Sequence, residues 1–253
     1  LNKIMTLLLI MEEIEKGSLE PQTKVTVSRF AESMGGSQIF LSAGTKIKIQ
    51  NLIKAVAIAS ANDAAVVLAE AAAGNEKSFV KTMNKRAEQL NMENTKFLNS
   101  TGLPPASGNK QFSTVTDIAK MSRALITKYP RILELTSTWV EYLNINEREV
   151  MLANTNKLLN NYAGLDGLRT GYTEKAGYCL AATAKRGDLR LLTVVLNADS
   201  KEVRRKAASR LLDYGFNRFE KRILIEKDKK VHNIQIPGGE KLTTAARSQS
   251  QLS

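Results

Sequence analysis

The sequence contains very little cysteine and histidine, which limits the kinds of site it can build. Among 253 residues there is one cysteine, Cys179, and one histidine, His232. A single cysteine excludes an internal disulfide bond and a cysteine-based metal cluster, and the apolar run around Cys179 favours a buried, unreactive thiol. A Ser-His-Asp triad or a zinc site would depend on His232 alone, so the sequence favours neither.

Aromatic residues and long apolar runs are also scarce. The chain carries 37 lysines and arginines against 25 acidic residues, a formal charge of +12, which favours an anionic partner such as nucleic acid, an acidic membrane face or an acidic polymer. The basic residues are scattered and aromatics make up only 6% of the chain, so we predict no direct nucleic-acid binding and interpret the charge as a solvated positive surface. Without a run of about eighteen apolar residues, we predict no membrane span.

The first stretch, residues 1–17, predicts a helix buried in the core, because its apolar residues leave no polar stripe wide enough to face water. Lys3 lies inside this segment, where an unpaired ammonium is costly. It must therefore be paired or lower its pKa, which makes it a candidate general base. The alternative is that Lys3 lies at a frayed terminus and reaches solvent. Since the chain begins in mid-helix without a cap residue, we interpret it as the middle of a longer product.

The remaining pattern predicts a mixture of helices and strands. Helices are expected over residues 49–59, 64–74, 76–90, 113–129 and 200–212, and strands over 24–30, 148–153, 177–184 and 189–196, with turns at 160–167 and 185–188. Ser60-Ala61-Asn62 then forms an elbow between two buried helices, and Asn62 or Asp63 is suited to cap the second. We place a domain boundary near residue 217, with residues 218–253 as the start of a small, truncated β-rich unit.

Several segments, taken in order, give the chain a family likeness. They are Lys-Ile-Met-Thr at 3–6, Gly-Gly-Ser-Gln-Ile-Phe-Leu at 35–41, Ala-Ser-Ala-Asn-Asp-Ala at 59–64, Asn-Ser-Thr-Gly-Leu at 99–103, Asn-Thr-Asn-Lys-Leu-Leu at 154–159 and Asp-Gly-Leu-Arg-Thr-Gly-Tyr-Thr at 166–173. From Leu1 to about Phe219 the chain resembles the penicillin-binding D-alanyl-D-alanine carboxypeptidases of the serine β-lactamase superfamily.

This resemblance implies an α/β (α+β) fold of the serine β-lactamase and DD-peptidase type: a mainly antiparallel sheet flanked by helices, plus an all-helical lobe, within residues 1–217. It implies a serine enzyme that removes the terminal D-Ala of peptidoglycan stem peptides through an acyl-serine and is inhibited by β-lactams. No metal and no organic cofactor is expected. The protein would act outside the cytoplasm in the cell envelope, secreted or held at a membrane surface by regions outside this chain.

The resemblance also implies roles for individual residues. Lys3 would be the base of the family's Ser-x-x-Lys motif, since a lysine at i+3 lies on the same helical face as the nucleophile. Ser60 would relay a proton to the leaving amine, and Asn62 would hold Lys3 and the peptide group of the substrate. The serine of that motif would fall immediately before Leu1, and the sequence does not contain it, so either a longer product was cut there or the residue was omitted.

The third motif would bind the substrate. Arg169 and Thr170 would hold its terminal carboxylate, the strand from Gly171 would pair with its extended backbone, and the N–H of Tyr172 would help to form the oxyanion hole. The family usually has lysine where this chain has Arg169. Arginine keeps the charge and can bind a carboxylate through two parallel hydrogen bonds, but it stays protonated and cannot shuttle a proton.

Two other functions remain open. The chain could be a catalytically inactive module that binds peptidoglycan or partners, which a residue other than serine before Leu1 would favour. It could also be a β-lactamase, which requires a deacylating glutamate. The segment from Glu141 to Asn144 resembles the Glu-x-x-x-Asn loop of class A β-lactamases, but it is one residue too short, and we interpret it as a chance match.

Overall fold

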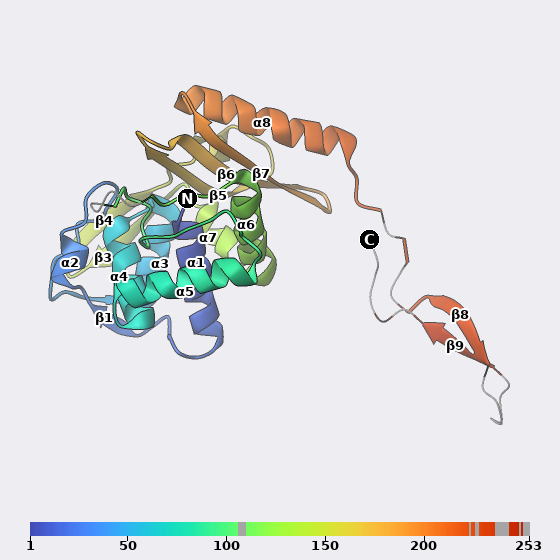
Figure 1. The fold of residues 1–253 in the computed structure, drawn as a ribbon, viewed down its shortest axis with the longest axis horizontal. Helices are drawn as coiled ribbons and strands as arrows, with labels where there is room; N and C mark the ends of the chain where they lie inside the picture. Colours follow the sequence, from blue (N-terminus) through green and yellow to red (C-terminus); the bar gives the residue numbers. More distant parts are fainter. Residues whose placement is uncertain (106–109, 223, 226–227, 236–242, 248, 250–253) are drawn as a thin grey trace.

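The computed structural model describes residues 1–105, 110–222, 224–225, 228–235, 243–247 and 249. A three-stranded antiparallel sheet lies between α8 (Lys201–Arg218) on one face and α1 (Lys3–Glu15), α6 (Val115–Lys128) and α7 (Ile132–Thr136) on the other (Figure 1). A lobe of helices with two small strand pairs continues beyond them (Figure 1). This architecture confirms the predicted fold class.

The helix α1, Lys3–Glu15, runs through the centre of this body and contacts α4, α5 and α6. All its residues from Lys3 to Ile10 are buried, as its lack of a polar stripe predicts. The chain turns away at Gly17, whose positive φ of 77° suits glycine. The first two turns of α1 therefore lie inside the core.

The helix α3, Ile49–Lys54, continues into a π-helical turn η1, Ala55–Ala59, and α4, Asn62–Ala73, follows. The predicted elbow is confirmed: Ser60 takes a left-handed conformation with φ 63°, which ends the first helix. The predicted cap is wrong, because Ala61 holds the cap position and Asn62 begins α4. The carboxylate of Asp63 instead accepts the N–H groups of Ile39 and Leu41 at 3.0 and 3.1 Å.

The strand predicted over residues 24–30 is correct only at its start. The strand β1, Lys24–Thr26, pairs with β2, Lys46–Lys48, and the short helix α2, Arg29–Glu32, follows. The side chain of Ser28 caps α2 by accepting the N–H of Ala31 at 2.9 Å, so a local cap outcompetes the alternating pattern.

The next elements carry the chain to the sheet. The helices α5, Glu76–Gln89, and α6, Val115–Lys128, match their predictions. The helix α7, Ile132–Thr136, and the strand β3, Val140–Ile145, were not predicted. The strand β4, Arg148–Ala153, which pairs with β3, was predicted with its full bounds.

The sheet consists of β5, Leu165–Thr173, β6, Gly177–Arg186, and β7, Leu189–Ala198, in that order. The β6–β7 hairpin was predicted. The turn expected over residues 160–167 is wrong at its end, because β5 already begins at Leu165. A short 3-10 helix, η2, Lys157–Asn160, precedes β5. The helix α8, Lys201–Arg218, extends six residues beyond its prediction and packs on β6 and β7.

After α8 the described chain forms one strand pair, β8, Lys230–Gln235, with β9, Thr243–Arg247. The division into domains at residue 217 stays a prediction. None of the described helices has the combined length and apolar character that crossing a membrane requires.

Candidate active site

Lys3 lies in the first turn of α1 with its side chain inside the protein. It is 6% exposed, and its ammonium donates a hydrogen bond to the carbonyl of Thr101 at 2.9 Å. One turn later, Thr6 donates to the carbonyl of Ser100 at 2.7 Å, so two bonds tie the loop at 99–103 to α1. The interpretation that Lys3 frays into solvent is therefore wrong.

The surroundings of Lys3 change its acidity. The pKa of Lys3 is lowered to about 7, mainly by burial and in addition by the positive charge of Arg169, while the carboxylate of Asp63 opposes this shift. Lys3 therefore interacts electrostatically with both Arg169 and Asp63. An amine with a pKa near neutrality can accept a proton at physiological pH, as a general base must.

The elbow at Ser60 lies against the loop at residues 35–41. The side-chain amide of Asn62 donates to the carbonyl of Gly35 at 2.6 Å, and its backbone N–H donates to the carbonyl of Ser37 at 2.6 Å. A Cβ atom at Gly36 would come within 2.8 Å of the Asn62 amide nitrogen, so only glycine fits there. Within the described chain, neither Ser60 nor Asn62 forms a hydrogen bond with Lys3, and their predicted roles stay predictions.

Arg169 extends from β5 to the end of the π-helical turn that precedes Ser60. Its Nη2 donates to the carbonyl of Val56 and, at 3.2 Å, to that of Ala57. Carbonyls at a helix C-terminus lack helical partners, and a cation is favourable there. The side chain is 3% exposed, and burial lowers its pKa to about 10. Arg169 therefore remains charged at neutral pH and caps the helix beside the elbow.

The rest of the third motif lies along β5. The hydroxyl of Thr170 shares a hydrogen bond of 2.7 Å with that of Thr155, and the ring of Tyr172 stacks on Tyr178 with centroids 4.4 Å apart. A Cβ atom at Gly171 would lie 3.4 Å from the backbone nitrogen of Leu1, so the start of α1 lies directly beside β5. Among the described strands β5 pairs only with β6, which leaves its other edge free to bind an extended peptide.

The structure thus brings three distant stretches of the chain together. Leu1 lies against Gly171, Arg169 reaches the carbonyls that precede Ser60, and Lys3 is close enough to Arg169 for their charges to interact. Burial and a nearby cation both favour the neutral amine, which is the form of Lys3 that can act as a base.

Two residues of the site were missed from the sequence. The carbonyl of Thr101 accepts a hydrogen bond from Lys3. The carboxylate of Asp63, which is fully buried, accepts the N–H groups of the residues before and after Phe40, whose φ of 57° is strained. The segment at 99–103 was noted as a family segment, but a backbone acceptor leaves no signal in side-chain patterns. A buried acid directly after the Ser-x-Asn elbow was the available signal for Asp63.

The segment from Glu141 to Asn144 lies within the strand β3 and does not form a loop. The carboxylate of Glu141 forms an ion pair with Lys54. This arrangement supports its interpretation as a chance match.

The described residues also contain no group of three or more histidine, cysteine or acidic side chains able to hold a metal ion.

Comparison with known sequences identifies related proteins. A family model described as D-alanyl-D-alanine carboxypeptidase, peptidase family S11, matches residues 1–200. The D-alanyl-D-alanine carboxypeptidase DacF of Bacillus subtilis is 41% identical over 240 residues, which cover 94% of this chain and 61% of the relative. The chain therefore spans less than two thirds of the length of that relative.

Solved structures agree with this similarity. The D-alanyl-D-alanine carboxypeptidase DacD of Francisella tularensis superposes with a TM-score of 0.84 at 27% identity, covering 99% of this chain and 72% of the other. Penicillin-binding protein D2 of Listeria monocytogenes, in its cefotaxime-bound form, superposes with a TM-score of 0.77 at 34% identity and covers 85% of each chain.

Proposed function

Because the chain belongs to the D-alanyl-D-alanine carboxypeptidase family, we propose that the full-length protein removes the terminal D-Ala of peptidoglycan stem peptides through an acyl-serine. The observation that carries this proposal is the buried Lys3, whose pKa is lowered to about 7 beside Arg169. This is the state required of a base that activates a serine.

We propose that the nucleophile is a serine immediately before Leu1. The backbone nitrogen of Leu1 lies beside Gly171, so a residue attached there would lie next to the third motif. Neutral Lys3 would accept the proton of the serine hydroxyl as its oxygen attacks the carbonyl of the penultimate D-Ala. Ser60 would pass a proton to the departing nitrogen of the terminal D-Ala, and water would then hydrolyse the acyl-serine.

The free edge of β5 supports the proposed binding of the substrate. The peptide backbone would pair with the strand from Gly171, and the hydroxyl of Thr170 would donate to the terminal carboxylate. Arg169 would attract that carboxylate mainly through its charge, since its Nη2 already donates to helix carbonyls. The N–H groups of Tyr172 and of the serine would stabilise the oxyanion.

The amide of Asn62 would orient the peptide group of the substrate from the opposite side. Its bond to Gly35 fixes the elbow, and its remaining donor and acceptor positions suit a peptide group. The same site would be acylated by β-lactams, and cefotaxime binding by the Listeria relative supports this. Because peptidoglycan lies outside the cytoplasm, we expect the protein to act in the cell envelope.

A fluorescent penicillin provides the test. We expect covalent labelling of the full-length protein, and its loss when the preceding serine is replaced by alanine or when Lys3 is replaced by methionine. Lys16→Met, which removes an exposed lysine at the end of the same helix, is the matched control and should leave labelling intact. No labelling of the unmodified protein, or a residue other than serine before Leu1, would favour an inactive binding homologue.

A further inference from the structure

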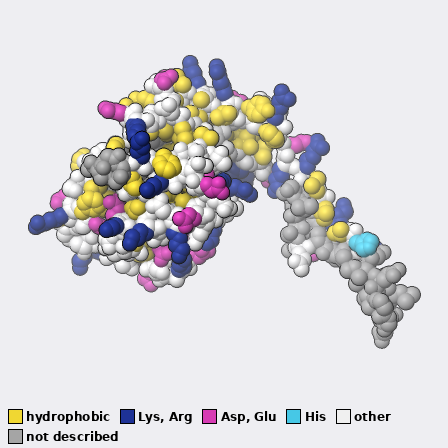
Figure 2. All heavy atoms as spheres, in the orientation of Figure 1, with side chains coloured by type: hydrophobic (Ala, Val, Ile, Leu, Met, Phe, Trp, Pro, Cys, Tyr) yellow, Lys and Arg dark blue, Asp and Glu magenta, His cyan; other side chains and the backbone are white. Residues whose placement is uncertain are grey.

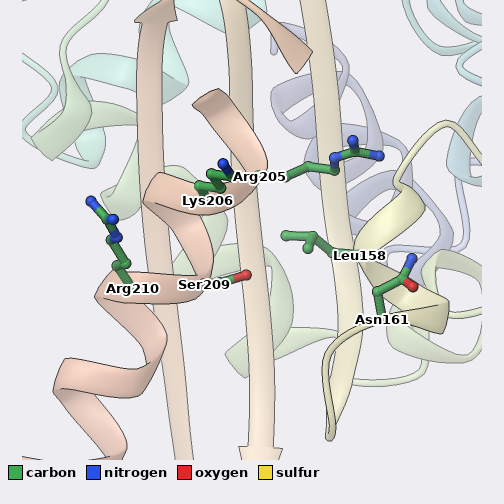
Figure 3. Close-up of a pocket in the computed structure, with 6 residues that line it drawn as sticks. All are labelled: Leu158, Asn161, Arg205, Lys206, Ser209 and Arg210. Atoms are coloured by element: carbon green, nitrogen blue, oxygen red, sulfur yellow. The ribbon is translucent and has the colours of Figure 1, made fainter. Parts of the chain in front are cut away.

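A cavity of about 590 Å³ lies between η2 and α8. Figure 3 shows Arg205 and Ser209 extending from α8 toward Leu158 and Asn161. Lys206 lies beside Arg205, and Arg210 extends from the other side of the helix, at the rim of the cavity. None of these residues belongs to the site around Lys3, so this cavity is a separate feature of the protein.

Every polar side chain that lines this cavity carries a hydrogen-bond donor, and none of them is a carboxylate. Three cationic side chains are joined by a serine hydroxyl and an asparagine amide. Within the described chain, Lys206 and Arg210 form no ion pair. Arg205 pairs with Glu202 at 2.9 Å, but this i,i+3 pair is solvent-accessible and therefore weak. All three cations remain able to bind an anion.

The helix α8, which carries four of these side chains, is itself held firmly in place. Ala208 and Leu212 are fully buried on its inner face, and the side chain of Ser200 caps its first turn. Arg204 turns inward and donates to the carbonyl of Cys179, so it lies apart from the cavity. Six basic residues against two acidic ones give α8 a net positive charge of its own. Because the helix backbone is rigid, it sets the positions from which these cationic side chains extend.

We propose that this cavity binds a water-soluble organic phosphate, a phosphate ester or diester of a polyol. An arginine presents parallel donors that match phosphate oxygens, and lysine adds a point charge. The volume of the cavity leaves room for an organic group beside the phosphate, whose hydroxyls Asn161 and Ser209 can bind. Leu158 is the one apolar residue in the lining and is itself buried, so the carbon surface of the cavity comes from the stems of the polar and charged side chains, which suits the carbon skeleton of a polyol.

Titration calorimetry of the full-length protein with a short poly(glycerol phosphate) at about 0.15 M salt tests this proposal. We expect the double variant Arg205→Gln and Arg210→Gln to bind at least about tenfold more weakly, as the loss of two charge-assisted contacts predicts. The matched control, Lys201→Gln with Arg218→Gln, removes the same charge from the same helix outside the cavity and should change affinity by less than about twofold.

Three outcomes would overturn the proposal. Equal losses in the two double variants would show diffuse attraction to the lysine and arginine side chains that are spread over the surface (Figure 2). Binding to phosphatidylglycerol vesicles that requires Arg205 and Arg210, without binding of the soluble polymer, would assign the cavity to a lipid headgroup. Absence of binding by the unmodified protein at millimolar polymer would remove the site. Melting temperatures of all variants, which we expect to be unchanged because these side chains lie on the outer face of α8, exclude misfolding as the cause.

Discussion

Acylation of the full-length protein by a β-lactam is expected to increase with pH through the pKa of Lys3. Only the neutral amine can accept the proton of the serine hydroxyl. Burial lowers this pKa to about 7, so about half of the lysine is neutral at pH 7. A lysine with an ordinary pKa would be roughly 0.03% neutral at that pH. The structure therefore accounts for a gain of about three orders of magnitude in the active form of the base.

The assay is the second-order rate constant for labelling by a fluorescent penicillin between pH 5 and pH 9. Below the pKa of Lys3 the rate should fall about tenfold per pH unit, with its midpoint within about one unit of pH 7. A rate that does not change with pH, or a midpoint above about pH 9, would refute the assignment of Lys3 as a buried neutral base.

Stability must be measured alongside the rate, and here the sign matters. The folded-state pKa of Lys3 lies below its unfolded value, so between about pH 7 and pH 10.5 the unfolded state binds more protons. The free energy of unfolding therefore rises with pH across this window, and the cost of burying the amine, on the order of 5 kcal/mol, is present in full below pH 7. Circular dichroism at each pH separates loss of the base from unfolding.

Three further predictions concern single residues near the site. Replacing Arg169 by methionine should move the acid limb of the labelling profile to higher pH, because the pKa of Lys3 rises when the nearby charge is removed. It should also lower the free energy of unfolding by about 2 kcal/mol, because two helix carbonyls lose their donor; an unchanged profile would contradict this. Asp63→Ala should lower the melting temperature by about 6 °C or more, since about 3 kcal/mol is lost with a buried acceptor of three N–H groups; a shift below about 2 °C in a thermal melt would be inconsistent. Gly36→Ala should reduce penicillin labelling by displacing the asparagine amide of the elbow, whereas Gly35→Ala, with open space around it, should not; equal labelling of the two variants would count against this contact.

Elements with strong local signals could be predicted from the sequence. The first helix has no polar stripe, and β6 and β7 are apolar runs on either side of a short turn at Gly187 and Asp188, so their positions follow from the sequence pattern. The elements missed are those fixed by their neighbours: β3 is short and half exposed, and α2 depends on one capping bond from Ser28. Three-residue strands such as β2 carry too few side chains to form a pattern.

The candidate site was predictable to a different degree. Lys3, Ser60 and Asn62 and the motif from Arg169 to Tyr172 were identified through the family resemblance, because each segment has a recognisable sequence. The contacts that organise them were not, since the carbonyls of Val56, Ala57 and Thr101 are backbone groups that any residue supplies. Side-chain identity tells where a donor is, but only the fold tells which carbonyl it reaches.

We expect the arginine at position 169, where the family resemblance implies a lysine, to determine which residue loses its proton. Arg169 and Lys3 are both buried; burial lowers the pKa of each, and the charge of Arg169 also lowers the pKa of Lys3. Of two buried bases that repel one another, the one with the lower ordinary pKa loses its proton first, and here that is Lys3. A lysine at position 169 would instead compete for the same proton, and the pair would titrate together. With arginine there, position 169 keeps a permanent charge, and every proposed proton transfer falls to Lys3 and Ser60.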